Sequence, residues 1–394
     1  MNLLGAAIVE DLDREIAFAQ RTSPFYSVVF SAFRDFFAGE SNGAAEGGLS
    51  DILQLWKGKV VTAWFERPLL LSAALHRVAL ADPQGQLGRF YATCGGRYDA
   101  GDETAFREAI LATITPARSA FTHFLTLQSL QTNEISRGLT WLIPSAAEWT
   151  HVRRPVVLVE LGCSAGLNLM ADSYGWSFQG QGWQWSQFGS LRLEATISAD
   201  DQEGLSNAIA ALPLMSSAIR RRIGCDLHVP DVSDGSARSM LEAMIWGDNE
   251  PRLARLRQGL AVLEAARTAG YLELHQGSAL EVVPCIALEL SRTLSKEHMV
   301  VFFNTVVTCY FDDDSYQTLK EHILAAALGP LRDHHVLWIE HEPVGSRNVS
   351  PAGARRNESV ITVHRPTLGA LTATVLGYTE MHPRTLHFEQ LVGK

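Results

Sequence analysis

The first 150 residues carry apolar side chains at intervals of three and four, the spacing that places them on one face of an α-helix. The pattern is strongest in residues 10–20, 23–37, 68–81 and 103–149. Glycine-rich stretches at 41–48 and 94–101 interrupt it, as breaks between helices do. The pattern therefore predicts an all-helical domain over residues 1–150.

The pattern changes after Arg153-Arg154-Pro155, where VVLVELG is a continuous β-branched and apolar run typical of a strand buried on both faces. Further strands are predicted at 221–227, 271–277, 298–307 and 334–342, with helical segments between them. Strand alternating with helix predicts an α/β domain over 151–394 with a parallel sheet. Residues 177–220 interrupt this alternation as an insertion that contains one strand, and 370–391 predict an antiparallel hairpin at the sheet edge.

Composition restricts the class of protein. The chain has 394 residues, 46% hydrophobic and 19% charged, which is enough apolar material for a sizeable core. Its net charge of −10 argues against a broad nucleic-acid or anionic-membrane surface. The five cysteines are scattered without a C-x-x-C pair, and the acidic N-terminus does not resemble a signal peptide. No apolar run is long enough to span a membrane, so we expect a cytoplasmic protein with no membrane partner. The spacing of His334, His335 and His341 matches no known set of metal ligands, so we expect no metal site.

The stretch Gly162-Cys-Ser164-Ala-Gly166 satisfies two motifs. It matches the G-x-S-x-G nucleophile elbow, which would make Ser164 the nucleophile of a hydrolase. About 150 helical residues precede it, however, and no oxyanion-type H-G-G segment is present. A dinucleotide oxidoreductase would need a third glycine at position 167, which is Leu.

A third interpretation fits better. An apolar strand, then Glu160, then Gly162, Ser164 and Gly166 resembles the S-adenosylmethionine loop of class I methyltransferases, with its middle glycine replaced by serine. The resemblance implies that Glu160 helps to hold the methionine end of the cofactor. It also implies that the loop and the following Asn168 approach the cofactor closely.

Later strands extend this resemblance. Asp226 ends the strand that would supply the ribose-binding acid, with Glu194 as a rival, and Leu227 follows it. Ser278 stands where the family usually has the adenine-binding Asp, before Ala279. Asn304 ends the strand that would face the transferring methyl group.

The chain as a whole resembles an uncharacterised bacterial family, domain-of-unknown-function family 2332. The segments that carry this resemblance run from RPLLLSAALHRVALA through QTNEISR, ELGCSAGLNLMADSYG and GCDLHVPDV to WGDNEPRLARL. The family name carries no activity, so function follows by analogy only. The resemblances imply a Rossmann-like class I methyltransferase sheet over 151–394 and an N-terminal helical cap over 1–150.

Polar residues on the predicted helical cap are candidates for the substrate site. Gln131, Asn133, Glu134 and Arg137 interrupt an apolar helical segment, and Asn133 and Arg137 would share a helix face. They either present polar groups to a substrate or form a buried hydrogen-bond network. His76, flanked by apolar residues, is either a core histidine or a substrate-site residue.

Two further residues follow the loop. Asn168 and Asp172 would share a face of the helix after Gly166, and Asp172 is expected to brace the loop that follows Glu160.

We therefore expect an S-adenosylmethionine-dependent methyltransferase that acts on a small-molecule acceptor. Glu134 is the candidate base, Asn304 the orienting group, and His76 a third candidate near the methyl group. An S-adenosylmethionine-binding protein with other chemistry, a non-catalytic sensor and a Ser164 hydrolase remain open alternatives. The sequence names neither the acceptor nor the oligomeric state.

Overall fold

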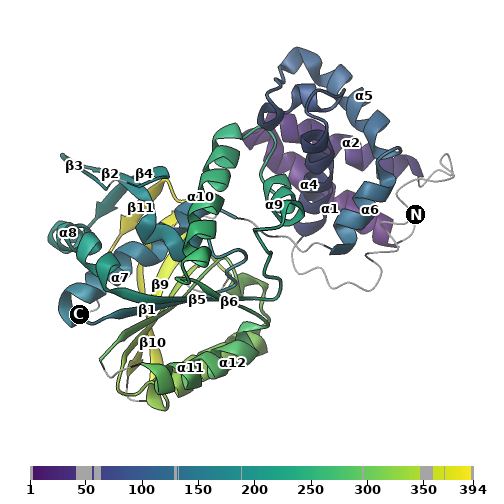
Figure 1. The fold of residues 1–394 in the computed structure, drawn as a ribbon. Helices are drawn as coiled ribbons and strands as arrows, with labels where there is room; N and C mark the ends of the chain where they lie inside the picture. The colour runs from purple at the N-terminus through teal and green to yellow at the C-terminus, as the bar shows by residue number, and fades with distance from the viewer. Residues whose placement is uncertain are drawn as a thin grey trace. The chain divides into compact units, whose positions relative to one another are not determined.

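The computed structural model describes residues 3–40, 56, 64–127, 131, 133–187, 189–294, 297–346, 358–367 and 369–391 (Figure 1). The chain divides into two compact units, each built from two chain segments. We call residues 1–133 with 234–257 the helical unit, and residues 134–233 with 258–394 the sheet unit.

The helical unit has a single apolar core that includes a late segment of the chain. Met240 and Ala243 belong to this core, the Trp246 ring stacks on Tyr26 at 4.3 Å, and the Gly247 N–H donates to the Tyr26 hydroxyl at 2.7 Å. The helices of this unit are α1 (Leu3–Thr22), α2 (Pro24–Glu40), α4 (Glu66–Ala81), η1 (Gly88–Phe90), η2 (Ala92–Cys94), η3 (Ala100–Asp102), α5 (Glu103–Ile114), α6 (Arg118–Leu127) and α9 (Gly235–Ala243).

The unit boundaries differ from the predicted division at residue 150. Helices η4 (Ile135–Gly138) and α7 (Leu139–Val152) belong to the sheet unit, whereas 234–257 belongs to the helical unit. The boundary at 257/258 falls inside α10 (Glu250–Thr268). Helical periodicity identifies a buried face but not its partner, and for α7 that partner is the sheet: Trp141 stacks on Phe303 at 5.3 Å.

The sheet unit is an α/β structure around one mixed sheet of eleven strands in the order β3-β2-β4-β11-β10-β9-β8-β7-β1-β5-β6. Its strands are β1 (Val156–Leu161), β2 (Gly175–Gly180), β3 (Trp183–Ser186), β4 (Arg192–Ala199), β5 (Ile219–Asp226), β6 (Glu273–Gln276), β7 (Met299–Thr305), β8 (His335–Pro343), β9 (Glu358–Thr367), β10 (Ala370–Glu380) and β11 (Thr385–Phe388).

Strands β6, β5, β1, β7 and β8 are mutually parallel, as the alternation of strand and helix predicts. The first of them in the chain, β1, lies at the centre with β5 on one side and β7 on the other, which makes the β1/β7 junction a topological switch point. The predicted hairpin of β10 and β11 is antiparallel. It does not end the sheet, because the insertion supplies three strands, β2, β3 and β4, instead of one.

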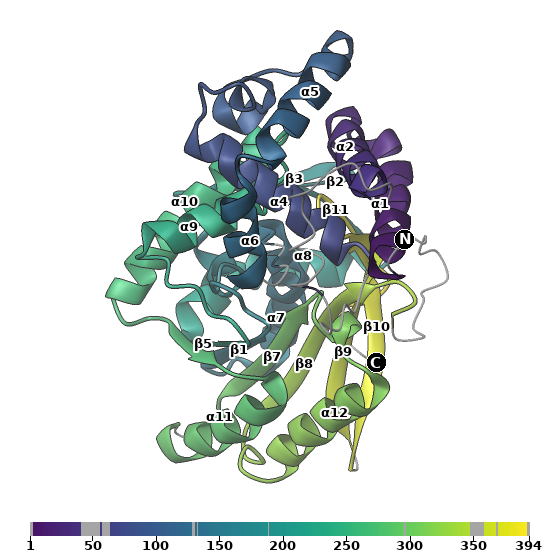
Figure 2. The same cartoon turned by 90° about the vertical axis from the view of Figure 1, so that its right-hand side faces the viewer.

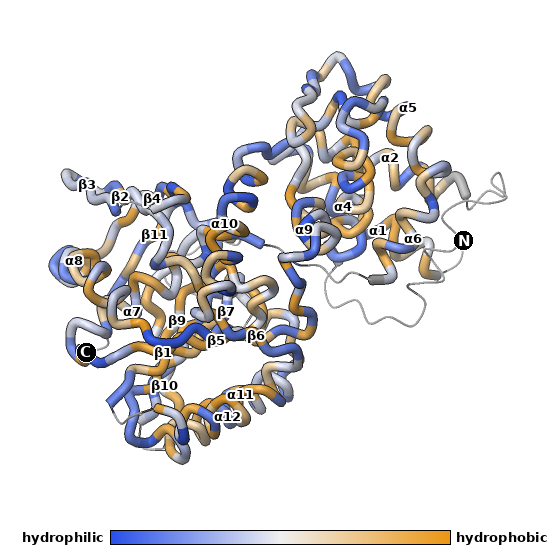
Figure 3. The backbone as a smooth tube through the Cα atoms, in the orientation of Figure 1, coloured by the Kyte–Doolittle hydropathy of each residue, from blue (hydrophilic) through white to orange (hydrophobic). Residues whose placement is uncertain are grey.

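Helices cover the parallel part of the sheet on both faces (Figures 1 and 2). Helices α11 (Ala279–Thr293) and α12 (Asp313–Leu328) lie side by side and share an apolar core with β1, β5, β7 and β8. Helix α7 packs on the opposite face, with α8 (Gln202–Ala218) against it. Hydrophobic residues run through the centre of the sheet (Figure 3), as expected of strands buried on both sides.

A charged network fixes the C-terminal end of α7 to the sheet. The Glu148 carboxylate lies 2.7 Å from His335 Nε2 of β8 and accepts from Arg365 Nη2 of β9 at 2.6 Å. Burial alone would raise the pKa of Glu148, but the hydrogen bonds from His335 and Arg365 outweigh it and lower the pKa to about 2. The ionised form is thus preferred by the folded protein.

This network predicts a pH-dependent contribution to stability. The folded pKa lies below the ordinary value, so the contribution is present above about pH 4.5 and disappears as pH falls towards 2. We expect Glu148→Gln to lower the free energy of unfolding at pH 7 by roughly 3 kcal/mol and to show little difference from wild type at pH 2 and below. Urea unfolding across pH measures this, with the exposed Glu203→Gln in α8 as control. An equal deficit at every pH would contradict the linkage.

Candidate functional site

The loop after β1 has an unusual backbone. Gly162, Ser164 and Gly166 have φ values of +71°, +49° and +91°. Serine rarely adopts this left-handed conformation, so the position that is glycine in the methyltransferase pattern carries strain here. A Cβ on Gly162 would lie 2.4 Å from Val307 Cγ2, so the loop after β7 leaves no room for a side chain there.

Strand β5 holds this loop from the other side. The N–H groups of Gly162 and Cys163 donate to the carbonyl oxygen of Cys225 at 2.8 and 3.0 Å, and Ser164 N–H donates to Asp226 Oδ2 at 2.7 Å. A Cβ on Gly224 would lie 2.7 Å from Cys163 Sγ. The loop therefore runs between β5 and the loop after β7, with its backbone close to both.

Glu160 lies at the end of β1 and is buried, with 1% of its surface exposed. Burial raises its pKa well above the ordinary value and the Asp226 carboxylate adds to the rise, whereas hydrogen bonding from Asn168 and from the Leu169 backbone opposes it. Its Oε2 atom has no hydrogen-bond partner among the described residues. Buried carboxyl oxygens in native proteins usually have a hydrogen-bond partner. A bound ligand could supply the partner that Oε2 of Glu160 lacks among the described residues.

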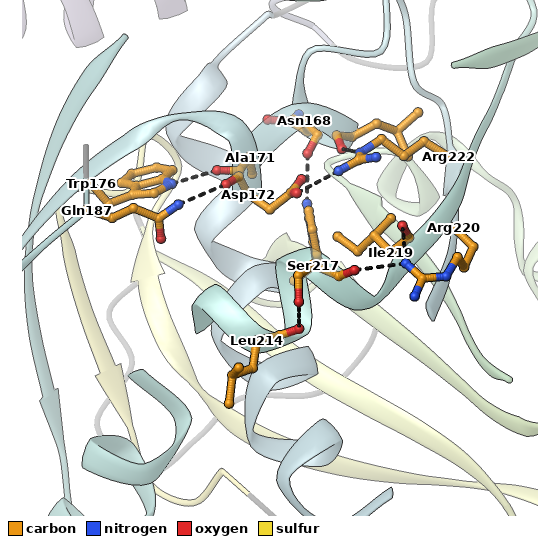
Figure 4. Close-up of polar contacts among 12 residues, drawn as sticks. Asn168, Ala171, Asp172, Trp176, Gln187, Leu214, Ser217, Ile219, Arg220 and Arg222 are labelled. Atoms are coloured by element: carbon orange, nitrogen blue, oxygen red, sulfur yellow. Dashed lines mark hydrogen bonds and ion pairs between the residues drawn. The ribbon is translucent and has the colours of Figure 1, made fainter. Parts of the chain in front are cut away.

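The chain continues from the loop into η5 (Asn168–Ser173), a short 3-10 helix (Figure 4). Trp141 Nε1 of α7 donates to the Asn168 carbonyl oxygen at 2.8 Å, and the buried Asp172 pairs with Arg222 of β5 at 2.6 Å. This agrees with the bracing role expected of Asp172. A 3-10 helix has three residues per turn, so the prediction that Asn168 and Asp172 share a helical face is wrong.

Asp226 and the predicted adenine-side residues come together at the ends of β5 and β6. Gly277 N–H donates to the carbonyl oxygen of Asp226 at 2.8 Å. Ser278 is the N-cap of α11, where its hydroxyl accepts from Leu280 N–H, and Ala279 is the first residue of that helix. Leu227, next to Asp226, is 64% exposed. The rival Glu194 lies on β4, which β11, β10, β9, β8 and β7 separate from β1.

Asn304 faces the other side of the sheet from Glu160. Glu160 is in register with Phe303, which stacks on α7, whereas Asn304 is in register with Leu161 and so points towards α11 and α12. Asn304 is 1% exposed; its Oδ1 accepts from Trp338 Nε1 at 2.6 Å and its Nδ2 donates to Glu342 Oε1 at 2.7 Å. These bonds occupy both ends of its amide.

Glu342 organises the loop after β7. Its carboxylate accepts from the N–H groups of Val307, Thr308 and Cys309 at 2.8, 2.9 and 3.0 Å. Val306, just before them, has a φ of +59°, which is strained for a β-branched residue. Asn304 thus acts through Glu342 on the loop whose Val307 presses against Gly162.

A polar cluster lies on the α7 face of the sheet unit, and we call Glu134, Arg137, His341 and His382 the carboxyl-end cluster. Arg137 Nε donates to the carbonyl oxygen of Met381 at 3.0 Å, and Glu134 Oε2 lies 3.7 Å from His382 Nδ1. His341 is fully buried, and neither ring nitrogen makes a hydrogen bond of ordinary geometry among the described residues.

Strand directions explain why these residues meet. β10 is antiparallel to β9 and β9 to β8, so His382, just after β10, lies at the same edge as the carboxyl ends of β8 and β7. His341 is in register with Thr305 of β7, on the face of α7. The sequence alone did not indicate that either histidine belongs to this site. The alternation of His341 with Glu340 and Glu342 was the available signal that it faces the opposite side of β8.

The polar motif at 131–137 is not a helix face. Residues 131, 133 and 134 lie outside helices and Arg137 is in η4, so the predicted pairing of Asn133 and Arg137 across a helix turn is wrong. Gln131 and Asn133 belong to the helical unit, where the carbonyl oxygen of Asn133 accepts from Arg252 Nη2 at 3.3 Å. Glu134 and Arg137 belong to the sheet unit.

His76 lies in the core of the helical unit. Its Nδ1 is 3.1 Å from the carbonyl oxygen of Ala243 and its Nε2 is 2.7 Å from Thr93 Oγ1. Burial is the main reason that its pKa falls to about 4. These surroundings are those of a hydrogen-bonded core histidine.

The described residues contain no group of three or more His, Cys, Asp or Glu side chains placed to hold a metal ion. Within the same part of the chain, no helix is long and apolar enough to cross a membrane.

Comparison with known proteins identifies the family. Residues 15–388 match the model of the family described as "Uncharacterized protein conserved in bacteria (DUF2332)", and the chain belongs to that family. No curated protein matches the chain.

The close approach of Val307 predicts different costs for two glycine substitutions. Gly162 and Gly182 both have positive φ, +71° and +78°, but a Cβ on Gly182 would meet nothing within 4 Å. Gly182→Ala is expected to cost about 1–2 kcal/mol of backbone strain, and Gly162→Ala about 1–3 kcal/mol more because it overpacks against Val307.

Urea unfolding of both variants measures these costs. Val307→Ala in the Gly162→Ala background should restore the stability lost to overpacking, because it removes the methyl groups that the new Cβ meets. Equal losses in the two alanine variants would show that the loop has room at Gly162.

Proposed function

We propose that this member of the DUF2332 family is an S-adenosylmethionine-dependent methyltransferase that acts on a small-molecule acceptor, and that its sheet unit is of the Rossmann-like methyltransferase type. One observation carries the proposal: the positive-φ loop after β1 is held by hydrogen bonds to β5, beside Asp226 and next to the switch point between β1 and β7. Ligands of open α/β sheets bind outside the carboxyl ends of strands at such a point.

The residues at the end of β5 fit the nucleoside part of the cofactor. Each Asp226 oxygen accepts one backbone N–H, from Ser164 and from His228, and a carboxylate has about four acceptor positions. Asp226 therefore has capacity left for ribose hydroxyls. The exposed Leu227 offers an apolar surface for the adenine ring. The Ser278 hydroxyl accepts the capping hydrogen bond and still has a proton to donate.

Glu160 fits the amino-acid part. A ligand ammonium would give its unpaired Oε2 the charged partner that the described residues do not supply. Gly162, Ser164 and Gly166 let the backbone approach, and Asn168 assists by its hydrogen bonding to Glu160. No long α-helix begins directly after the loop, so a helix dipole contributes less here than in the general pattern.

Bound S-adenosylmethionine would supply a methyl group activated by its sulfonium. The chain's own residues would then align an acceptor and exclude water. In this arrangement Asn304 is a positioning residue, since it acts through Glu342 on the loop beside Gly162. Glu134 and Arg137 lie on the α7 face, where they would bind the acceptor. We leave His76, Gln131 and Asn133 out of this site because they belong to the helical unit.

One observation favours a second candidate, an S-adenosylmethionine-binding protein with other chemistry or a sensor. Ser278 caps α11 at the place where the methyltransferase pattern has an adenine-binding Asp, so the cofactor contact is reduced. The Ser164 hydrolase gains no such support, because a nucleophile elbow leads into an α-helix and this loop leads into a six-residue 3-10 helix.

Calorimetric titration with S-adenosylmethionine and S-adenosylhomocysteine tests cofactor binding. We expect both ligands to bind wild type, and Asp226→Asn to weaken binding about 10- to 100-fold through the loss of charge-assisted hydrogen bonds. Glu160→Gln should weaken it similarly. A ligand ammonium also lowers the pKa of Glu160, so binding in weakly acidic buffer should release protons, and this release should be smaller in Glu160→Gln.

The matched control is Glu194→Gln on the exposed part of β4, which should bind both ligands as wild type does. Methyl transfer is then tested by the release of S-adenosylhomocysteine. Binding without such release would favour the sensor. Absence of binding to wild type at millimolar ligand, or an Asp226→Asn variant that binds normally, would contradict the cofactor site.

A further inference from the structure

The carboxyl-end cluster contains a histidine whose buried ring is incompletely hydrogen-bonded. Both nitrogens of His341 are buried, and neither makes a hydrogen bond of ordinary geometry among the described residues, although the Glu380 backbone approaches the ring. The other buried histidine of this strand pair, His364, bonds through Nε2 to Glu340 at 2.6 Å and stacks on Trp338. Burying two unsatisfied polar atoms in one ring costs free energy, so a native structure rarely keeps them without a use.

The position of His341 relates it to the proposed cofactor loop. Glu160 of β1, Thr305 of β7 and His341 of β8 lie on the same face at the carboxyl ends of three adjacent strands. Asn168 Nδ2, from the segment after the loop, approaches Thr305 Oγ1 at 3.4 Å, and Thr305 is in register with His341. The switch point lies between β1 and β7, and β8 is the next strand after β7. Adjacent strands are about 4.8 Å apart, so the backbone of His341 lies about that distance from the end of β7.

The neighbours of His341 keep its ring in the neutral form. Burial lowers the pKa of His341 well below its ordinary value, and the nearby Arg137 guanidinium and His382 imidazole lower it further, whereas hydrogen bonding to the Glu380 backbone opposes them. The ring is therefore neutral at physiological pH and has one nitrogen able to accept a proton. His382 is half exposed, and its Nδ1 lies 3.7 Å from Glu134 Oε2, so this histidine is accessible to solvent.

We propose that His341 is the general base of the reaction and that the acceptor therefore carries an O–H or N–H group. This inference rests on the proposed methyltransferase function and adds the acceptor class to it. The oxygen or nitrogen of the acceptor forms a bond to the methyl carbon, the carbon–sulfur bond breaks with its electron pair left on sulfur, and the acceptor proton passes to a His341 ring nitrogen. His382 and Glu134 then relay the proton to solvent. An acceptor without such a proton would need no base.

The test uses the full-length protein, tritiated S-adenosylmethionine and a protein-free bacterial metabolite extract as the source of acceptor. We expect His341→Ala to bind S-adenosylhomocysteine with the wild-type affinity and to transfer methyl at least 100-fold more slowly. Imidazole added at millimolar concentration should restore at least a tenth of the lost rate by taking the place of the removed ring. The control is His364→Ala, which removes a buried histidine from the other face and should show no response to imidazole.

The outcomes separate the two proposals. If His341→Ala keeps its rate, or if it loses both rate and ligand affinity without a response to imidazole, the base assignment is overturned while the methyltransferase function stands. If wild type binds the cofactor and transfers methyl to nothing in the extract, the methyltransferase proposal itself is overturned, and the base assignment with it.

Discussion

The loop after β1 depends on close approach of backbone to its neighbours. Gly162 leaves room for Val307 on one side, and Gly224 leaves room for Cys163 on the other. With these contacts the N–H groups of Gly162, Cys163 and Ser164 reach acceptors on β5. The strain at Ser164 and Val306 persists because the surrounding hydrogen bonds hold both segments in place. The strand ends that carry Glu160, Asp226 and Asn304 all adjoin this loop or its neighbours.

The alternation of side chains along β1, β7 and β8 divides the polar groups of the sheet unit into two sets. On the α11 and α12 face, Asn304 and Glu342 are saturated with hydrogen bonds, and they shape the loop after β7. On the α7 face, Glu160 and His341 have buried polar atoms without hydrogen bonds of ordinary geometry among the described residues. Saturated groups stabilise a structure, whereas unsatisfied ones are available to a ligand. The proposed chemistry is therefore assigned to the second face.

The sequence predicted features that depend on adjacent residues well, and contacts between residues far apart in the chain poorly. β-Branched runs located the parallel strands, and the G-x-S-x-G pattern located the loop, because both depend on adjacent residues. The compact units do not divide at residue 150 because the core partners of Trp246 and Trp141 lie far away in the chain. The grouping of Asn304 with Glu160 ignored the register that turns them to opposite faces. The cluster of Glu134, Arg137, His341 and His382 depends on the order of β8, β9 and β10, which hydrophobic pattern does not specify.

Hydrogen–deuterium exchange with and without S-adenosylhomocysteine tests the central claim most directly, because it reports where the ligand binds without requiring the acceptor. The account predicts slower exchange in residues 160–168 and in the segments 226–228 and 277–280, where the loop, β5 and β6 end. Strands β2, β3 and β4 should be unaffected, since they lie at the far end of the sheet. Protection confined to those strands or to the helical unit, with 160–168 unchanged, would contradict it.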